Sequence, residues 1–411
     1  MFDKLKCLFS FNWFYIVLFL VLSIFSFGDE ITVGRETIKM IIKDKQDFSQ
    51  KSQYVNSKNN KFNFIDIDKI SSNDDMVIYT GEIEYIFFHP LILDSQKGFD
   101  TRKNNNRKLY NLFITTDEFK KCLEKLYEND YILVDIFDVY KEVYKEGKFK
   151  VQRQDLKIPK GKKPFILFVD DLSYNGYMLN STSSKLVLDE SDFKIKSLSI
   201  EDWKEVLSDD KEIIPILNKF IEEHEDFSLN NAKGVISLTG SEGVFGYNTG
   251  KYARGNEKNV ETLRRLSKDI FDAKKVADKL KEDGWKFACH TYDHINFKNV
   301  TTDYIKNDIE NWFKYVSNIV GTTNIFVYPY DNSINEGDER FKYLNSNGFN
   351  IFCSSDKGIN RDSFTLKDHV NIHRDLICYE TIKSNKKNFY KIFEDVINKD
   401  TRKIKKKNLI Y

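Results

Sequence analysis

The chain has 411 residues, of which 41% are hydrophobic and 15% aromatic, enough apolar material for a large core. Its 64 basic and 63 acidic residues leave a net charge of +1, so no overall positive field favours nucleic acid, and we expect no such partner. The five cysteines are scattered, and their spacing indicates neither a zinc knuckle nor a disulfide framework.

Residues 1–30 are predicted to be a signal anchor or a signal peptide. Lys4 and Lys6 precede an apolar stretch from Cys7 to Phe27, which is long enough to span a bilayer. Because positively charged residues stay on the cytoplasmic side, the rest of the chain is expected outside the cytoplasm. The length of the stretch favours an uncleaved membrane anchor, and a cleaved signal peptide is the alternative.

Three further regions follow this segment. Residues 31–80 are rich in Lys, Asn, Asp, Ser and Gln with weak periodicity, which is typical of a polar spacer. A single large domain is expected over residues 81–400, with an insert at about 179–263. Residues 401–411 form a short basic tail, which we interpret as a solvated end.

Strand and helix patterns alternate along the large domain. A capping-box pattern at Thr115 and Glu118 opens one amphipathic helix, and Gly284, Gly321 and Gly348 are predicted to end three others. Repeated strand–helix units predict an α/β fold with a parallel sheet, and seven or eight strands favour a closed barrel over an open, doubly wound sheet. The candidate strands are Tyr85–His89, Tyr131–Val134, Phe165–Asp170, Val235–Thr239, Trp285–Cys289, Asn324–Tyr328, Phe349–Cys353 and Val370–His373.

Two motifs carry candidate metal ligands: Asp170-Asp171, which ends the apolar run Pro164–Val169, and His290-Thr-Tyr-Asp-His294. The histidine spacing places both imidazoles on one side of a helical turn. Two imidazoles and one carboxylate form the ligand set of an open divalent site with room for water, and the second carboxylate is suited to accept a proton. Such ligands suit zinc, with cobalt or nickel as alternatives.

The insert contains a glycine-rich stretch, 239–250. It is not a phosphate-binding loop, because the required serine or threonine after Lys251 is replaced by Tyr252. A tight surface loop is the favoured interpretation, and stacking of Phe245, Tyr247 and Tyr252 on sugar rings is the alternative. Outside the insert, His89 ends a strand. It either faces the cleft in which these aromatic residues would bind sugar or has a structural role.

These motifs resemble those of the polysaccharide deacetylases, carbohydrate esterase family four. The resemblance covers roughly residues 82–398 and rests on motifs that occur in the family's order: Asp170-Asp171, His290-Thr-x-x-His294, Tyr328-Pro329-Tyr330 and Ile372-His373. It implies an irregular (β/α) barrel that removes acetyl groups from N-acetylated sugars, often in cell-wall polysaccharides.

The resemblance also implies roles for individual residues. Asp171, His290 and His294 correspond to the metal ligands, and Asp170 corresponds to the general base. The backbone N–H of Tyr330 corresponds to a group that holds the oxyanion. A further correspondence makes His373 the residue that protonates the leaving amine.

Three departures from the family pattern leave alternatives open. Leu172 replaces a glycine, Asp356 is only a loose counterpart of the fourth motif, and Val327 replaces an arginine, so a charge partner for Asp170 must come from elsewhere. We therefore expect an extracytoplasmic, metal-dependent N-deacetylase of a cell-wall or surface polysaccharide. The alternatives are a catalytically silent, glycan-binding barrel and a metal-dependent hydrolase of another amide or ester.

Overall fold

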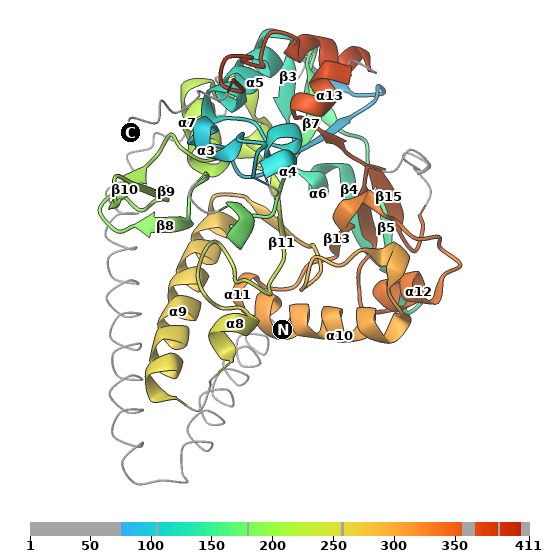
Figure 1. Cartoon of the computed structure of the whole chain (residues 1–411). Helices are drawn as coiled ribbons and strands as arrows, with labels where there is room; N and C mark the ends of the chain where they lie inside the picture. Colours follow the sequence, from blue (N-terminus) through green and yellow to red (C-terminus); the bar gives the residue numbers. More distant parts are fainter. Residues whose placement is uncertain are drawn as a thin grey trace. The chain divides into compact units, whose positions relative to one another are not determined.

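The computed structural model describes residues 75–103, 106–178, 181–255, 259–355, 366–384 and 387–403 (Figure 1). The barrel unit comprises Ile67–Gly255 and Lys268–Tyr411, and a second unit includes the described residues 259–267. The apolar stretch Cys7–Phe27, the spacer up to residue 74 and Asp356 lie outside the described residues. Among the helices of the described ranges, none has the length and apolar character needed to cross a bilayer.

A ring of parallel strands forms the core of the barrel unit. The segment from Val370 to Leu376 pairs with one edge strand through β15 and with the opposite edge, β2, through β16, so the sheet becomes a nearly closed barrel. β3 (Tyr131–Leu133) pairs with the start of β7 outside this ring. The predicted irregular (β/α) barrel and all eight predicted strands are confirmed, with shifts of up to two residues at their ends. In spatial order the ring strands are β2 (Glu84–Phe88), β7 (Lys163–Asp170), β11 (Val235–Leu238), β12 (Lys286–Cys289), β13 (Ile325–Val327), β14 (Ile351–Ser354), β15 (Val370–His373) and β16 (Asp375–Leu376).

Alternate side chains of each strand fill the barrel interior. Ile166 and Phe168 of β7 belong to the interior cluster, and Asp170 follows them on the same face of the strand. Ile372 of β15 is also in this cluster, and Arg374 follows it with the same alternation. The two charged side chains therefore enter the barrel at the ends of their strands.

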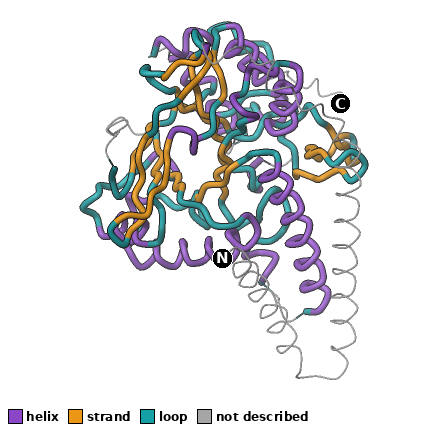
Figure 2. The backbone as a smooth tube through the Cα atoms, turned by 180° about the vertical axis from the view of Figure 1, so that it is seen from behind, coloured by secondary structure: helices purple, strands orange, loops and turns teal. Residues whose placement is uncertain are grey.

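Helices flank the barrel strands (Figures 1 and 2). The capping box of α5 is formed as predicted, because the Thr115 side chain accepts from the Glu118 N–H and the Glu118 side chain accepts from the Thr115 N–H. The three predicted glycine stops, Gly284, Gly321 and Gly348, have φ of 104°, 92° and 96°, the left-handed region that favours glycine. The helices are α3 (Ser95–Gly98), α4 (Asn106–Leu112), α5 (Thr116–Glu128), α6 (Ile136–Val139), α7 (Ile213–Glu223), α8 (Lys251–Arg254), α9 (Val260–Glu282), α10 (Thr302–Trp312), α11 (Asn318–Val320), α12 (Glu339–Ser346) and α13 (Tyr379–Ser384).

Two antiparallel pairs that the sequence patterns do not predict lie next to the barrel strands. One is the hairpin of β4 (Tyr140–Lys145) and β5 (Lys148–Arg153), and the other pairs β1 (Met76–Ile78) with β6 (Lys157–Pro159). Tyr140 and Val151 of the hairpin are buried in the same cluster as the strand side chains. The Tyr140 hydroxyl lies 2.9 Å from that of Tyr85, which is near the start of β2, so the hairpin covers the amino-terminal end of the barrel.

The insert contributes one barrel strand, β11, and a separate three-stranded antiparallel sheet. This sheet consists of β8 (Lys185–Asp189), β9 (Lys194–Glu201) and β10 (Lys204–Ser208). Phe245 and Tyr247 of the glycine-rich stretch are buried, with 0% and 5% of their surfaces exposed. The alternative in which they stack on sugar rings is therefore wrong for these two residues, and the Tyr252 side chain lies outside the described residues.

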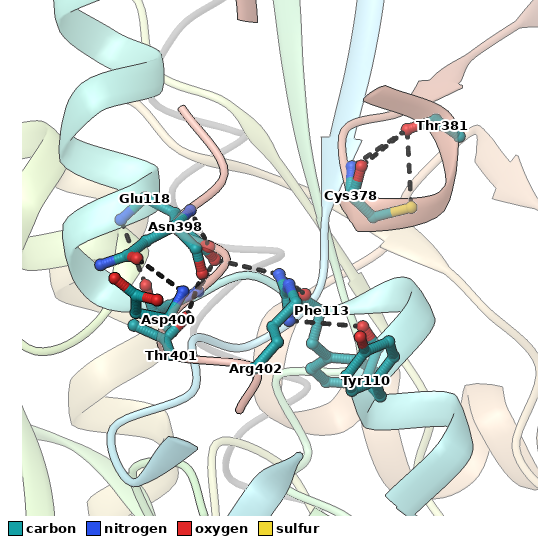
Figure 3. A network of polar contacts seen from close by, with 10 residues as sticks. Tyr110, Phe113, Glu118, Cys378, Thr381, Asn398, Asp400, Thr401 and Arg402 are labelled. Carbon is teal, nitrogen blue, oxygen red and sulfur yellow. Dashed lines mark hydrogen bonds and ion pairs between the residues drawn. The ribbon is translucent and has the colours of Figure 1, made fainter. Parts of the chain in front are cut away.

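The described end of the chain packs against α5 (Figure 3). Arg402 is buried and forms a 3.1 Å ion pair with Glu118, and its guanidinium also donates to the carbonyl oxygens of Tyr110 and Phe113. The interpretation of the basic tail as a solvated end is therefore wrong for Arg402. Its charge is compensated inside the fold, and only Lys403 of the described tail residues is strongly exposed.

Candidate metal centre

Asp171, His290 and His294 converge at the carboxyl ends of β7 and β12. One potential ligand atom of each lies within 4.8 Å of the others. The two imidazole rings have centroids 4.9 Å apart, and Nε2 of His294 lies 3.9 Å from Oδ2 of Asp171. The two histidines of one motif and the aspartate that follows a separate strand thus form a single group of three candidate ligands.

The histidine motif is a loop and not the predicted helical turn. Thr291 and His294 have φ of 62° and 51°, in the left-handed region. The N–H groups of Tyr292 and Asp293 donate to the two carboxylate oxygens of Asp308, which replaces the hydrogen bonding of a helix. The His290–His294 loop brings the imidazoles together through tertiary contacts, and the spacing alone is compatible with either conformation.

The donor atoms of this group fit a divalent cation. Nδ1 of His290 lies 2.9 Å from the Val327 carbonyl oxygen, which can only accept, so Nδ1 carries the hydrogen and Nε2 keeps its lone pair. Burial lowers the pKa of His294 to about 4 despite the opposing effect of Asp171, so its imidazole is neutral at pH 7. Oδ1 of Asp171 is buried without a hydrogen-bond partner among the described residues. A cation bound here would satisfy that oxygen, and nitrogen and oxygen donors of this kind suit zinc.

Asp170 is paired with Arg374, which supplies the charge that Val327 lacks. Two parallel hydrogen bonds of 2.9 Å join the guanidinium to the carboxylate, and Arg374 is only 1% exposed. Burial alone would raise the pKa of Asp170, but Arg374 outweighs it and holds that pKa well below its usual range. Asp170 is therefore an ionised carboxylate beside the metal ligands.

Arg374 was missed from the sequence, although a signal existed. Val370 and Ile372 face inward, and Arg374, two residues further on, is expected on the same face. A charged residue on the interior face of a barrel strand needs a partner. The two partners are 204 residues apart, so only the closure of the barrel brings them together.

His89 lies beside the centre. Its Nδ1 is 3.2 Å from the Leu112 carbonyl oxygen, and its ring stacks on Phe113 with centroids 4.7 Å apart. Its charge acts on the pKa of both Asp170 and His294, which places it within electrostatic reach of each. The contact with this carbonyl occupies Nδ1 of His89, so Nε2 is the ring nitrogen that it leaves for other contacts.

His373 contacts a different group of side chains, Asp375 and Lys387. Its Nε2 is 3.3 Å from Oδ1 of Asp375 and 3.4 Å from Nζ of Lys387, and the Tyr390 hydroxyl donates to the same carboxylate. Strand alternation also turns His373 away from the barrel interior, since its neighbour Arg374 points inward. This placement does not support the role of proton donor to a leaving amine.

Aromatic residues border the centre. The Tyr330 ring packs edge-on against His294 with centroids 4.4 Å apart, is 50% exposed, and belongs to a turn with φ of 56°. Tyr177 was missed from the sequence because no spacing distinguishes it. Burial raises the pKa of Tyr177, and the charges of Asp171 and Tyr330 raise it further, so Tyr177 lies within electrostatic reach of the centre.

Comparison with known proteins identifies part of the chain. Residues 245–350 match the family model described as polysaccharide deacetylase. No curated protein matches the sequence. Two of the solved structures that match the chain have a TM-score of 0.39 each. The Streptococcus pyogenes deacetylase PplD in complex with acetate shares 14% identity over 75% of this chain and 99% of its own. IcaB from Ammonifex degensii shares 12% identity over 73% of this chain and 93% of its own.

The matched residues contain His290, His294 and the Tyr328-Pro329-Tyr330 turn, while Asp170 and Asp171 reach the same centre from outside them. The predicted resemblance is confirmed for the segment that carries the two histidines, since residues 245–350 match the polysaccharide deacetylase family model.

Proposed function

We propose that this chain is a metal-dependent N-deacetylase of an N-acetylated cell-wall or surface polysaccharide. The observation that carries the proposal is the convergence of Asp171, His290 and His294 beside an ionised, arginine-paired Asp170. Three ligands and an adjacent base are the parts that hydrolysis of an amide at a metal site requires.

The residues around the centre suggest how the reaction proceeds. A divalent ion held by Asp171, His290 and His294 would polarise the acetyl carbonyl and lower the pKa of a water molecule. Asp170 accepts the proton of the attacking water, and Arg374 keeps this carboxylate oriented and ionised beforehand. The backbone N–H of Tyr330 donates to the developing oxyanion.

The amine that leaves must gain a proton as the carbon–nitrogen bond breaks. We assign this step to His89, because His89 lies within electrostatic reach of Asp170 and His294 whereas His373 is bound to Asp375. The products are acetate and a sugar with a free amine. Since an amine becomes cationic at neutral pH, the reaction changes the charge of the polymer.

Acetate release tests the proposal directly. Purified protein is incubated with N-acetylated wall oligosaccharides, with and without chelator, and zinc, cobalt or nickel is then added back. The proposal expects acetate, its loss with chelator and its return with metal. Metal binding without acetate from any N-acetylated glycan would favour a silent, glycan-binding barrel. Acetate or another acid from non-sugar substrates alone would favour a hydrolase of a different amide or ester.

The proposed location of the enzyme is extracytoplasmic. It follows from Lys4, Lys6 and the apolar stretch Cys7–Phe27, with the membrane as a partner through that stretch. Protease added to intact, wall-stripped cells should digest the barrel while cytoplasmic markers survive. A barrel that stays protected until the membrane is lysed would place the enzyme away from wall glycan.

A further inference from the structure

The His290–His294 loop holds two metal ligands in an unfavourable backbone conformation. Thr291 and His294 both have positive φ, a region that residues with a branched or bulky side chain rarely occupy. A loop of this kind persists only if its surroundings hold it. Two groups of contacts, one on each side of the loop, provide this support.

Asp308 supports the loop from α10. Its Oδ1 accepts from the Tyr292 N–H at 2.7 Å and its Oδ2 accepts from the Asp293 N–H at 2.8 Å. Asp308 is only 2% exposed, so both charge-assisted hydrogen bonds are shielded from water. The helix is itself fixed, because the Trp312 side chain donates to the Leu238 carbonyl oxygen at 2.8 Å.

The glycine-rich stretch supports the other side of the loop. The N–H groups of Gly240 and Ser241 both donate to the Tyr292 carbonyl oxygen, at 3.0 and 2.9 Å. A Cβ at Gly240 would collide with Val316 Cγ2 and lie 2.6 Å from Tyr292 Cδ2, so a larger residue would force these side chains apart. Lys251, just after this stretch, adds a 2.6 Å ion pair with Asp293.

We infer that these contacts hold the His290–His294 loop in its ligating conformation before any ion binds, and that Asp308 is the positioning residue that sets the metal affinity. This inference rests on the proposed metal site, but it concerns the loop and can be tested without the deacetylase reaction. It also gives the glycine-rich stretch a role, which is to hold the loop that carries the two histidines through hydrogen bonds. Phe245 and Tyr247 of this stretch are buried and do not contact sugar.

Hydrogen exchange of the metal-free, full-length protein is the first test. After chelator treatment, the amides of Tyr292 and Asp293 are expected to exchange slowly, and added Co²⁺ should increase their protection only slightly. Exchange as fast as that of an unstructured peptide, followed by strong protection on addition of Co²⁺, would show that the ion orders the loop and would overturn the inference.

Substitution at Asp308 is the second test. Asp308→Asn keeps the shape but places an amide N–H against a backbone N–H, so the dissociation constant for Co²⁺ should rise about tenfold or more and the visible spectrum of bound Co²⁺ should change. The matched control is Asp303→Asn on the same helix, where the carboxylate is 94% exposed, and it should match the wild type.

The outcomes separate this inference from the proposed function. A Co²⁺ affinity of Asp308→Asn within twofold of the wild type would overturn the inference, whatever the protein hydrolyses. If the wild type binds Co²⁺ and releases no acetate, the proposed function fails and the role of Asp308 stands. If Asp308→Asn does not fold, the exchange measurement on the wild type decides.

Discussion

At the scale of single residues, Asp170 and Asp171 are neighbours in sequence with different surroundings. Asp170 is the last residue of β7 and meets Arg374, whereas Asp171 has a φ of 62°, so the chain turns there and its side chain meets the two histidines. The Asp170 carboxylate is held by two hydrogen bonds from the Arg374 guanidinium, and Asp171 keeps a buried oxygen that has no partner in the described part of the chain. This difference is the physical basis for separating a base from a metal ligand.

Loss of Arg374 should be costly, because it leaves the Asp170 charge buried without compensation. We expect Arg374→Gln to lower the free energy of unfolding by about 3–5 kcal/mol, and acetate release should fall with it. Urea denaturation measures the first effect. Adding Asp170→Asn to Arg374→Gln should restore part of the stability, since no carboxylate then remains. A loss below about 1 kcal/mol for Arg374→Gln would contradict the pairing.

Glu212 should make stability depend on pH. This fully buried carboxylate accepts from the Leu91 N–H, the Ile213 N–H and the Tyr174 hydroxyl, and burial raises its pKa from 4.5 to about 7. Between these values the folded state binds more protons than the unfolded state, so the free energy of unfolding falls as pH rises and levels off above pH 7. Glu212→Gln should remove about 2–3 kcal/mol of the difference between pH 5 and pH 8. Urea denaturation at both pH values checks this, and an unchanged difference would refute it.

At the scale of elements, the sequence predicts the strands and helices whose residue pattern directly reflects their burial or their capping. The barrel strands are apolar because both of their faces are buried, and the start of α5 is marked by the capping-box residues Thr115 and Glu118. The hairpin of β4 and β5 was not predicted because much of it is exposed and charged, so its pattern matches that of a loop. The His290–His294 loop was predicted as a helical turn, since its conformation depends on distant residues such as Asp308 and Gly240.

The contact between the end of the chain and α5 gives an element-scale prediction. Arg402→Gln breaks a buried ion pair with Glu118 and should lower the free energy of unfolding by about 3–5 kcal/mol. The neighbouring Lys403→Gln is the control. Lys403 is 77% exposed and pairs with an exposed Asp400, so its effect should stay within about 0.5 kcal/mol. Equal effects of the two substitutions in urea denaturation would argue against the packing of Arg402.

At the scale of the whole barrel, closure of the ring brings Arg374 to Asp170. Asp170 comes from the second strand of the ring and Arg374 from the last segment, which also joins β14 to β2. The three candidate metal ligands could be predicted from sequence because each motif is local. The partner of Asp170 could not, because it depends on which strands meet when the ring closes.

Metal content and acetate release, measured on the same samples of three proteins, test the central claim most directly. The wild type should hold one divalent ion per chain and release acetate from an N-acetylated wall oligosaccharide. Asp170→Asn should keep the ion and lose most turnover, because only the base is removed, whereas Asp171→Asn should lose ion and turnover together. Equal metal content in the two variants, or a wild type that binds no divalent ion under any loading condition, would contradict the account.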